Sequence, residues 1–300
     1  MKIILKIINN RNFLLISSLV LGLSLGKGVE HLKSYVLLLL AIAMVFSSTS
    51  FDFKQLKNFK QSIKTTITAF LLNYVLFGVI LLGTTFLLIK DTNLRYGLIV
   101  IAATPPGVAI IPFTLMYKGD TNYAMIGVLG VYILAIVVSP LIIGLAIPGA
   151  SFNAWKIIKI MIEIILIPLL ISRLLLWKKI FSTIQKIRGK VVNWTFAIII
   201  YTIIGLNRTE IFSEFITLFK LSVIFAISMF ALGLAYEILL KKRIDYQLRV
   251  PQNLMLTIKS SGFAAGTAIA LFGEKAALPS AILAVFVILY LVVFSTIYNR

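Results

Sequence analysis

The 300-residue chain is 60% hydrophobic and only 13% charged, whereas about a quarter of the residues in a soluble domain are charged. Its net charge of +19 lies in short clusters between long apolar runs, which argues against a basic face and hence against a nucleic-acid-binding protein. The lack of cysteine excludes disulfides and thiolate metal sites. Because the sequence contains neither phosphate-binding nor nucleophile motifs nor a metal-ligand cluster, we expect no enzyme activity and no cofactor.

The apolar runs are long enough for membrane-spanning helices, which need about 20 mostly apolar residues each. They predict an all-α integral membrane protein with one domain over residues 1–300 and about ten transmembrane helices. The expected spans are approximately 12–27, 34–51, 65–89, 94–117, 122–147, 154–177, 191–207, 215–240, 250–272 and 276–298.

The distribution of basic residues predicts the orientation. About two thirds of the 29 Lys and Arg residues fall in loops on the side of the N-terminus, which the positive-inside rule assigns to the cytoplasm. We therefore expect a multi-pass protein of the cell inner membrane, with the N- and C-termini in the cytoplasm. Its expected partners are the lipid bilayer and a small substrate, with no nucleic acid, and a monomer is the simplest assembly.

Ten spans divide into two halves of five, approximately 12–147 and 154–298, and an odd number of spans per half gives an inverted repeat. Matching spans carry interruptions, Thr104-Pro105-Pro106-Gly107 in the fourth and Lys259-Ser260-Ser261-Gly262 in the ninth. Adjacent prolines remove backbone donors and clash with the preceding turn. We predict that both helices are broken and that the breaks form a transport site. The simpler alternative is a kink or a close helix contact.

Lys259 is a charged residue inside an apolar span. It lies about ten residues from the loop residue Arg249, or ~15 Å along a helix, which places it near the middle of the bilayer. A charge at that depth is costly and therefore indicates function, unless the side chain reaches the interface. Three roles stay open: a fixed charge that stabilises the breaks, a group that exchanges a proton during transport, and a partner for a substrate carboxylate.

Two sets of motif residues accompany the interruptions: Ala103 to Gly107 with Thr114, Lys118-Gly119-Asp120 and Pro140, and Ser261-Gly262 with Ala277-Leu278-Pro279-Ser280-Ala281-Ile282. They resemble motifs of the bile acid:sodium symporter family. The resemblance implies a core domain with crossed, broken fourth and ninth helices, and a separate panel domain. It also implies transport of a small organic anion by alternating access.

The resemblance also implies where sodium ligands would stand. At those positions this chain has Ile110, Ile111, Ala124, Val128 and Met255, while Asn73 and Lys259 replace two glutamines. Sodium is a hard cation that needs oxygen ligands, which the apolar side chains do not supply. We therefore predict a divergent carrier without sodium coupling. In this hypothesis the Lys259 ammonium, held by Asn73 and by the carbonyl ends of the broken helices, occupies the position of the lost ion.

The predicted function is secondary active or facilitative transport of a small organic anion. Two alternatives stay open, an auxin-efflux-type carboxylate exporter and a non-transporting membrane receptor or scaffold. The candidate substrate and ion site comprises Asn73, Thr104, Pro105, Pro106, Gly107, Ile110, Ile111, Thr114, Met255, Lys259, Ser260, Ser261 and Gly262. Outside this site, Glu163 is expected to form a local pair with Lys159, and Asp120 to lie in a turn.

Overall fold

The computed structural model describes residues 11–25, 28–49, 59–147, 155, 159, 162–176 and 178–298. Every regular element in those ranges is helical. In chain order the elements are α2 (Arg11–Leu25), α3 (Glu30–Lys33), α4 (Val36–Ser48), α5 (Phe59–Phe70), η2 (Leu71–Leu76), α6 (Phe77–Leu88), α7 (Thr92–Ala103), α8 (Ile110–Met116), α9 (Thr121–Ala146), η3 (Ile162–Leu166), α11 (Ile167–Leu174), α12 (Lys178–Leu206), α13 (Arg208–Ser213), α14 (Phe215–Phe225), η4 (Ala226–Ala231), α15 (Leu232–Leu240), α16 (Tyr246–Thr257), α17 (Ser261–Phe272) and α18 (Glu274–Tyr298).

Helices occur in each of the ten stretches predicted to span the membrane, although parts of those stretches (26–27, 50–51, 177 and most of 154–161) lie outside the described residues. Within the described ranges, five helices are long and apolar enough to cross a membrane: Lys60–Leu88, Thr121–Ala146, Phe181–Leu206, Phe215–Leu240 and Glu274–Ser295. Large apolar side chains such as Leu87 and Leu145 are exposed, as expected for a surface that faces lipid. These features support a multi-pass membrane protein.

The predicted start of the seventh span at 191 does not coincide with the start of its helix. α12 begins at Lys178 and is one continuous helix to Leu206. Its first part carries several lysines and arginines, which are good helix formers. The basic cluster therefore does not end the helix.

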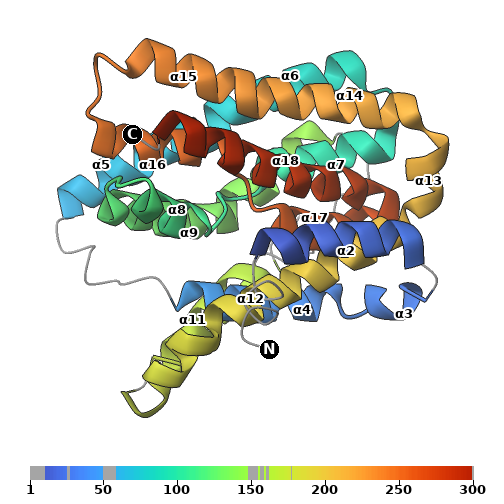
Figure 1. Ribbon diagram of the computed structural model, residues 1–300, viewed down its shortest axis with the longest axis horizontal. Helices are drawn as coiled ribbons and strands as arrows, with labels where there is room; N and C mark the ends of the chain where they lie inside the picture. The colour runs from blue at the N-terminus through green and yellow to red at the C-terminus, as the bar shows by residue number, and fades with distance from the viewer. Residues whose placement is uncertain are drawn as a thin grey trace.

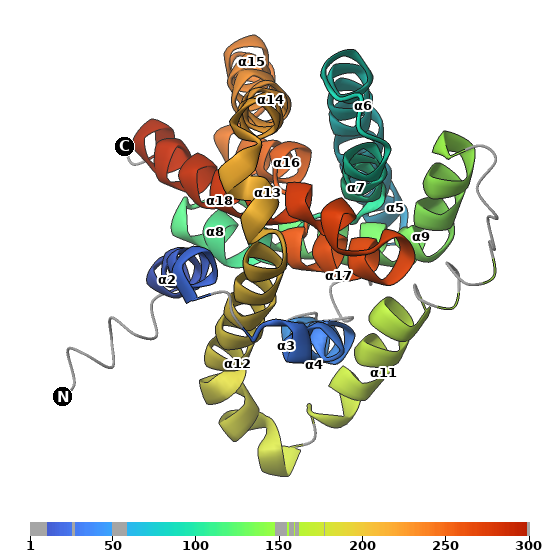
Figure 2. The ribbon, with the colours of Figure 1, turned by 90° about the vertical axis from the view of Figure 1, so that its right-hand side faces the viewer.

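The helices form two groups. α12 packs against α2 and α4, and α11 packs against α4; we call α2, α4, α11 and α12 the four-helix group. The larger group contains α5 to α9 and α14 to α18, with α18 against α7 and α17, and α5 against α9. Figure 2 shows α2, α4, α11 and α12 along the lower side of the molecule, and Figure 1 shows α14 and α15 along the opposite edge.

The chain is interrupted at both predicted positions, between α7 and α8 and between α16 and α17. The cause at the first is local, because Pro105 and Pro106 cannot donate the backbone hydrogen bonds that would continue α7. The two interruptions lie against each other, and an antiparallel bridge pairs Pro106 with Lys259.

Two backbone hydrogen bonds join the interruptions. The Gly107 N–H donates to the Ile258 carbonyl at 3.0 Å, and the Ser260 N–H donates to the Pro105 carbonyl at 3.2 Å. Non-helical backbone inside a membrane persists only where protein or water satisfies it. Each break therefore supplies backbone partners for the other.

The third and eighth spans each contain a π-helical segment, η2 and η4. Such segments shift the direction of the side chains that follow and often occur at functional sites. A third π segment, η3, lies in the predicted sixth span, whereas the described part of the first span, its counterpart, is α-helical. The π segments therefore do not test the inverted repeat. The repeat itself stays a prediction.

Candidate functional site

The Lys259 ammonium is buried at the paired interruptions, with 2% of the residue exposed. Its Nζ donates to Asn73 Oδ1 at 2.8 Å, to the Thr104 carbonyl at 2.8 Å and to the Ala102 carbonyl at 3.0 Å. An ammonium has three N–H donors, so these contacts use all of them. The structure thus brings three elements onto one cation: the third span, the end of α7 and the second interruption.

The prolines explain why α7 presents free carbonyls to this cation. In an uninterrupted helix the carbonyl of residue i accepts from the N–H of residue i+4. Pro106 stands at that position for Ala102 and has no N–H to donate. The Ala102 carbonyl accepts from Lys259 instead. The C-terminal end of a helix also carries partial negative charge, which favours a cation at this place.

The third span supplies the remaining contacts. Asn73 lies in η2 and is fully buried, and its Nδ2 donates to the Met255 carbonyl at 2.9 Å while its Oδ1 faces Lys259. The rings of Tyr74 and Phe77 lie 4.5 and 5.3 Å from Lys259 Nζ, within the range of a cation–π interaction. No ion pair joins Lys259 to a carboxylate among the described residues. Dipoles and ring faces surround the ammonium.

Five of the positions that the family resemblance assigns to sodium ligands, all except those of Asn73 and Lys259, are apolar and buried. Ile110, Ile111 and Met255 belong to the hydrophobic core. The Met255 side chain fills the space beside Gly127, where an added Cβ would lie 2.4 Å from its methyl group. Thr114 is also buried, and its Oγ1 makes no hydrogen bond within the described part of the chain. In the described residues no three His, Asp or Glu side chains come together as a metal site.

A cavity of about 520 Å³ lies between the two groups of helices, beside the interruptions. Most of its wall is apolar. The larger group contributes Gly107, Val108, Ala109, Ile111, Pro112, Phe113, Leu115, Thr121, Ile258, Lys259, Ser260, Ser261, Gly262 and Val287, and the four-helix group contributes Leu15, Met44, Ser47, Arg188, Gly189, Val192, Asn193, Phe196 and Ile200. Its volume is within the range of small-molecule sites.

The candidate residues thus divide between three environments. Asn73 and Thr104 contact the Lys259 ammonium, while Pro105 and Pro106 take part in the backbone pairing. Gly107, Ser260, Ser261 and Gly262 also line the cavity. Ile110, Met255 and Thr114 do not contribute to its wall, whereas Ile111 does.

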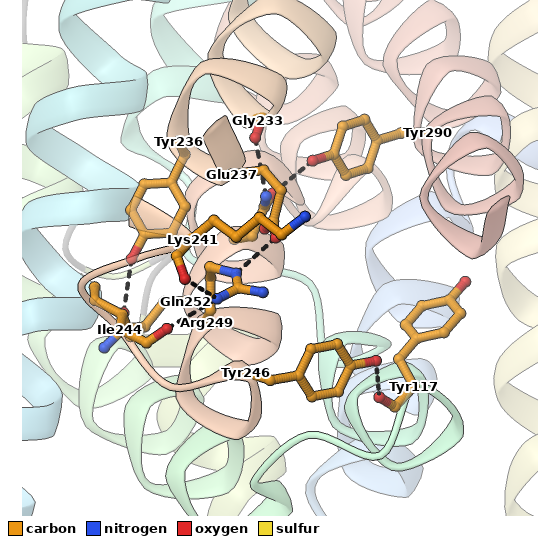
Figure 3. A network of polar contacts seen from close by, with 11 residues as sticks. Tyr117, Gly233, Tyr236, Glu237, Lys241, Ile244, Tyr246, Arg249, Gln252 and Tyr290 are labelled. Carbon is orange, nitrogen blue, oxygen red and sulfur yellow. Dashed lines mark hydrogen bonds and ion pairs between the residues drawn. The ribbon is translucent and has the colours of Figure 1, made fainter. Parts of the chain in front are cut away.

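A second polar cluster holds the α16 helix that leads to Lys259 (Figure 3). Arg249 Nε donates to Glu237 Oε1 at 2.6 Å, and both side chains are at least nine-tenths buried. The Arg249 Nη1 donates to the Lys241 carbonyl at 3.1 Å and to the Ile244 carbonyl at 2.8 Å, across the turn between α15 and α16. Arg249 was expected in a loop, but it lies inside α16 and joins this helix to α15.

The next turn of α16 extends the cluster. Tyr236 donates to Gln252 Oε1 at 2.6 Å. Asn253 donates to the Gly233 carbonyl at 2.9 Å and accepts from the Tyr290 hydroxyl at 2.5 Å, which ties α16 to both α15 and α18. Glu237 is not among the residues predicted from the sequence. The signal was a carboxylate within an apolar span, which needs a partner at that depth.

The two local predictions outside the site agree with the geometry. Glu163 lies 3.9 Å from Lys159 in an exposed i,i+4 pair. Asp120 is the N-cap of α9, and its side chain accepts from the Tyr123 N–H at 2.9 Å.

Comparison with known proteins gives two findings. A family model described as the sodium bile acid symporter family matches residues 37–214, which include the interruption between α7 and α8. An uncharacterized sodium-dependent transporter, YocS of Bacillus subtilis (strain 168), is 24% identical over 276 residues, which cover 89% of this chain and 83% of that protein.

Proposed function

This chain belongs to the sodium bile acid symporter family, and from that membership we propose that it carries a small organic anion across the membrane by alternating access, without coupling to sodium. The family and the relative point to a transporter rather than an enzyme. The carrier is either secondary active or facilitative.

The Lys259 ammonium is the observation that carries the proposal. It occupies the oxygen cradle formed by Asn73 Oδ1 and the carbonyls of Ala102 and Thr104. A sodium ion would need such oxygens, and two monovalent cations would repel each other at this distance in a medium of low dielectric. The lysine therefore supplies, as part of the chain, the positive charge that an ion would otherwise bring.

The arrangement of cavity and contacts supports alternating access. The cavity extends to Leu115 and Thr121, which flank the turn between α8 and α9. Toward the other end of the molecule, near α3 and α13 (Figure 1), Lys33 forms an ion pair with Glu274, and Asn207 Nδ2 donates to the Glu274 carbonyl at 3.1 Å. Both contacts join elements next to the four-helix group to the start of α18. Reaching the other side of the membrane would require these contacts to open.

The first test measures sodium binding directly. The purified chain in detergent is unfolded thermally in NaCl and in KCl at equal ionic strength, because a ligand that binds the folded state raises the midpoint. The wild type should show the same midpoint in both salts. Lys259→Ala should gain a higher midpoint in NaCl, because the three oxygens then face an empty space. Lys190→Ala, at an exposed position of α12, is the matched control. A sodium-specific rise in the wild type would refute the proposal.

The second test measures transport in proteoliposomes, with taurocholate and phenylacetate as labelled probes. Uptake by the wild type should be the same under sodium and potassium gradients. Lys259→Gln is then compared with and without a pH gradient. A loss of uptake under both conditions indicates a fixed charge or a substrate contact, whereas a loss of only the pH-driven part indicates proton exchange. Unchanged uptake under both would rule out a role for Lys259.

A further inference from the structure

Arg188 is a basic residue in the wall of the cavity. Its guanidinium forms no ion pair or hydrogen bond with any residue that the structure describes. The other lysine or arginine in the wall, Lys259, already uses its three donors on Asn73, Ala102 and Thr104. Arg188 is therefore the cation in the described wall with donors available to a ligand.

The polarity of the cavity wall changes along α12. Arg188, Val192, Phe196 and Ile200 all line the cavity at i, i+4 spacing, so they lie along one face of the helix. From Arg188 to Ile200 this face covers about 18 Å at 1.5 Å per residue. Asn193, whose amide has no partner within the described ranges, lies near the basic end. The α12 side of the wall is thus basic and polar at Arg188 and Asn193 and apolar at Phe196 and Ile200, where Phe196 lies against Gly262 of the second interruption.

The charge balance of the wall limits the ligand. No Asp or Glu is among the residues that line the cavity, so a bound cation would find no countercharge there. One available guanidinium matches one negative charge, and a second carboxylate on the ligand would have to be desolvated without a partner. The planar guanidinium fork fits a carboxylate with two parallel hydrogen bonds.

We propose that Arg188 recognises the carboxylate of an amphipathic monocarboxylate, whose apolar body lies along α12 toward Phe196 and Ile200. This inference rests on the proposed function and assigns one residue of its substrate site. Arg188 acts as a specificity-determining residue, and the shape of the wall selects a ligand with one charged end. Neutral analogues and dicarboxylates should bind more weakly than the monocarboxylate.

The test is a binding measurement on the purified chain, by the ligand-induced rise of the thermal midpoint over a concentration series. The probes are 4-phenylbutyrate, its neutral amide 4-phenylbutyramide and the dicarboxylate phenylsuccinate. The variants are Arg188→Gln, which removes the charge, Arg188→Lys, which keeps it without the fork, and Lys190→Gln, a matched control that removes an exposed charge two residues along α12. Circular dichroism and size-exclusion elution check that each variant is folded.

We expect 4-phenylbutyrate to stabilise the wild type and Lys190→Gln equally, and the amide and the dicarboxylate to bind at least tenfold more weakly. Arg188→Gln should weaken 4-phenylbutyrate by on the order of ten- to a hundredfold, the loss of a charge-assisted contact, with Arg188→Lys in between. Equal binding of acid and amide, or equal binding by the wild type and Arg188→Gln, would overturn the inference and leave the proposed function standing. Taurocholate and phenylacetate uptake by wild-type proteoliposomes tests the proposed function separately. Uptake that is absent or that depends on sodium would refute the proposed function.

Discussion

Arg249, in α16, and Lys259, in the interruption that follows this helix, are both buried cations, and they are held in different ways. Arg249 has a carboxylate partner in Glu237 and two carbonyls across the turn between α15 and α16. Lys259 has an amide oxygen, two carbonyls and two ring faces, with no acidic partner among the described residues. Arg249 and Glu237 form a neutral unit, whereas the charge at the breaks is uncompensated. The neutral pair is suited to hold α16 and α15 together in every state, and the bare charge is suited to a transport site.

Removing the acid from the neutral pair should have the largest effect on stability. Glu237→Gln leaves Arg249 as a buried charge without its partner, which costs about 3–5 kcal/mol of unfolding free energy. Unfolding of the purified chain in a detergent series measures this loss. Glu163→Gln is the control, because its pair with Lys159 is exposed and should cost no more than ~0.5 kcal/mol. Equal effects of both substitutions would mean that Arg249 does not depend on Glu237.

Removing an acceptor at the breaks should have a smaller effect on stability and a larger effect on transport. Asn73→Leu takes one oxygen from Lys259 and one donor from the Met255 carbonyl, and each buried group left without a partner costs about 1–3 kcal/mol. We expect taurocholate and phenylacetate uptake to fall as well, because the ammonium loses its hydrogen bond to the third span and keeps only the ring contacts with Tyr74 and Phe77 there. Asn193→Leu, which changes a cavity amide without contact to Lys259, should leave stability within about 0.5 kcal/mol of the wild type. If Asn73→Leu left the stability unchanged, the carbonyls of Ala102 and Thr104 alone would be sufficient to hold the Lys259 ammonium.

The sequence alone predicts the two breaks and the buried Lys259 between them, but it does not predict the ion pair of Glu237 in α15 with Arg249 in α16. Pro105 and Pro106 act through their own backbone, and Lys259 is conspicuous because a charge in an apolar run is costly. These signals are local. The partnership of Glu237 with Arg249 depends on how the turn between α15 and α16 brings two helices together, and no local pattern specifies it. Asn73 and Lys259 lie far apart in the chain, so no local pattern predicts their contact. Only the family resemblance predicts it.

A partly exposed ion pair between the N-cap of α7 and the first turn of α18 should contribute the least stability of the interactions compared. Asp91 accepts from Lys275 at 2.9 Å, with about a third of each side chain exposed. Burial works to raise the pKa of Asp91, but the hydrogen bonds from Lys275 and from the Leu94 amide outweigh it and hold the pKa below its usual value. A carboxylate with a lowered pKa adds stability above its unfolded pKa, and this stability is lost as the pH falls through its folded pKa.

Asp91→Asn removes the charge and keeps an N-cap for α7, because asparagine caps helices about as well as aspartate. The variant should be less stable than the wild type by at most ~1 kcal/mol near pH 7, the range of exposed pairs. The difference should shrink in high salt, which screens exposed charges, and should vanish at a pH below the folded pKa of Asp91. The thermal midpoints of the two proteins as a function of pH measure this effect. If the difference in stability persisted at low pH, the loss of the N-cap and not the loss of the charge would be its cause. The loss of stability in Glu237→Gln, by contrast, should not decrease in high salt, because the pair of Glu237 with Arg249 is buried.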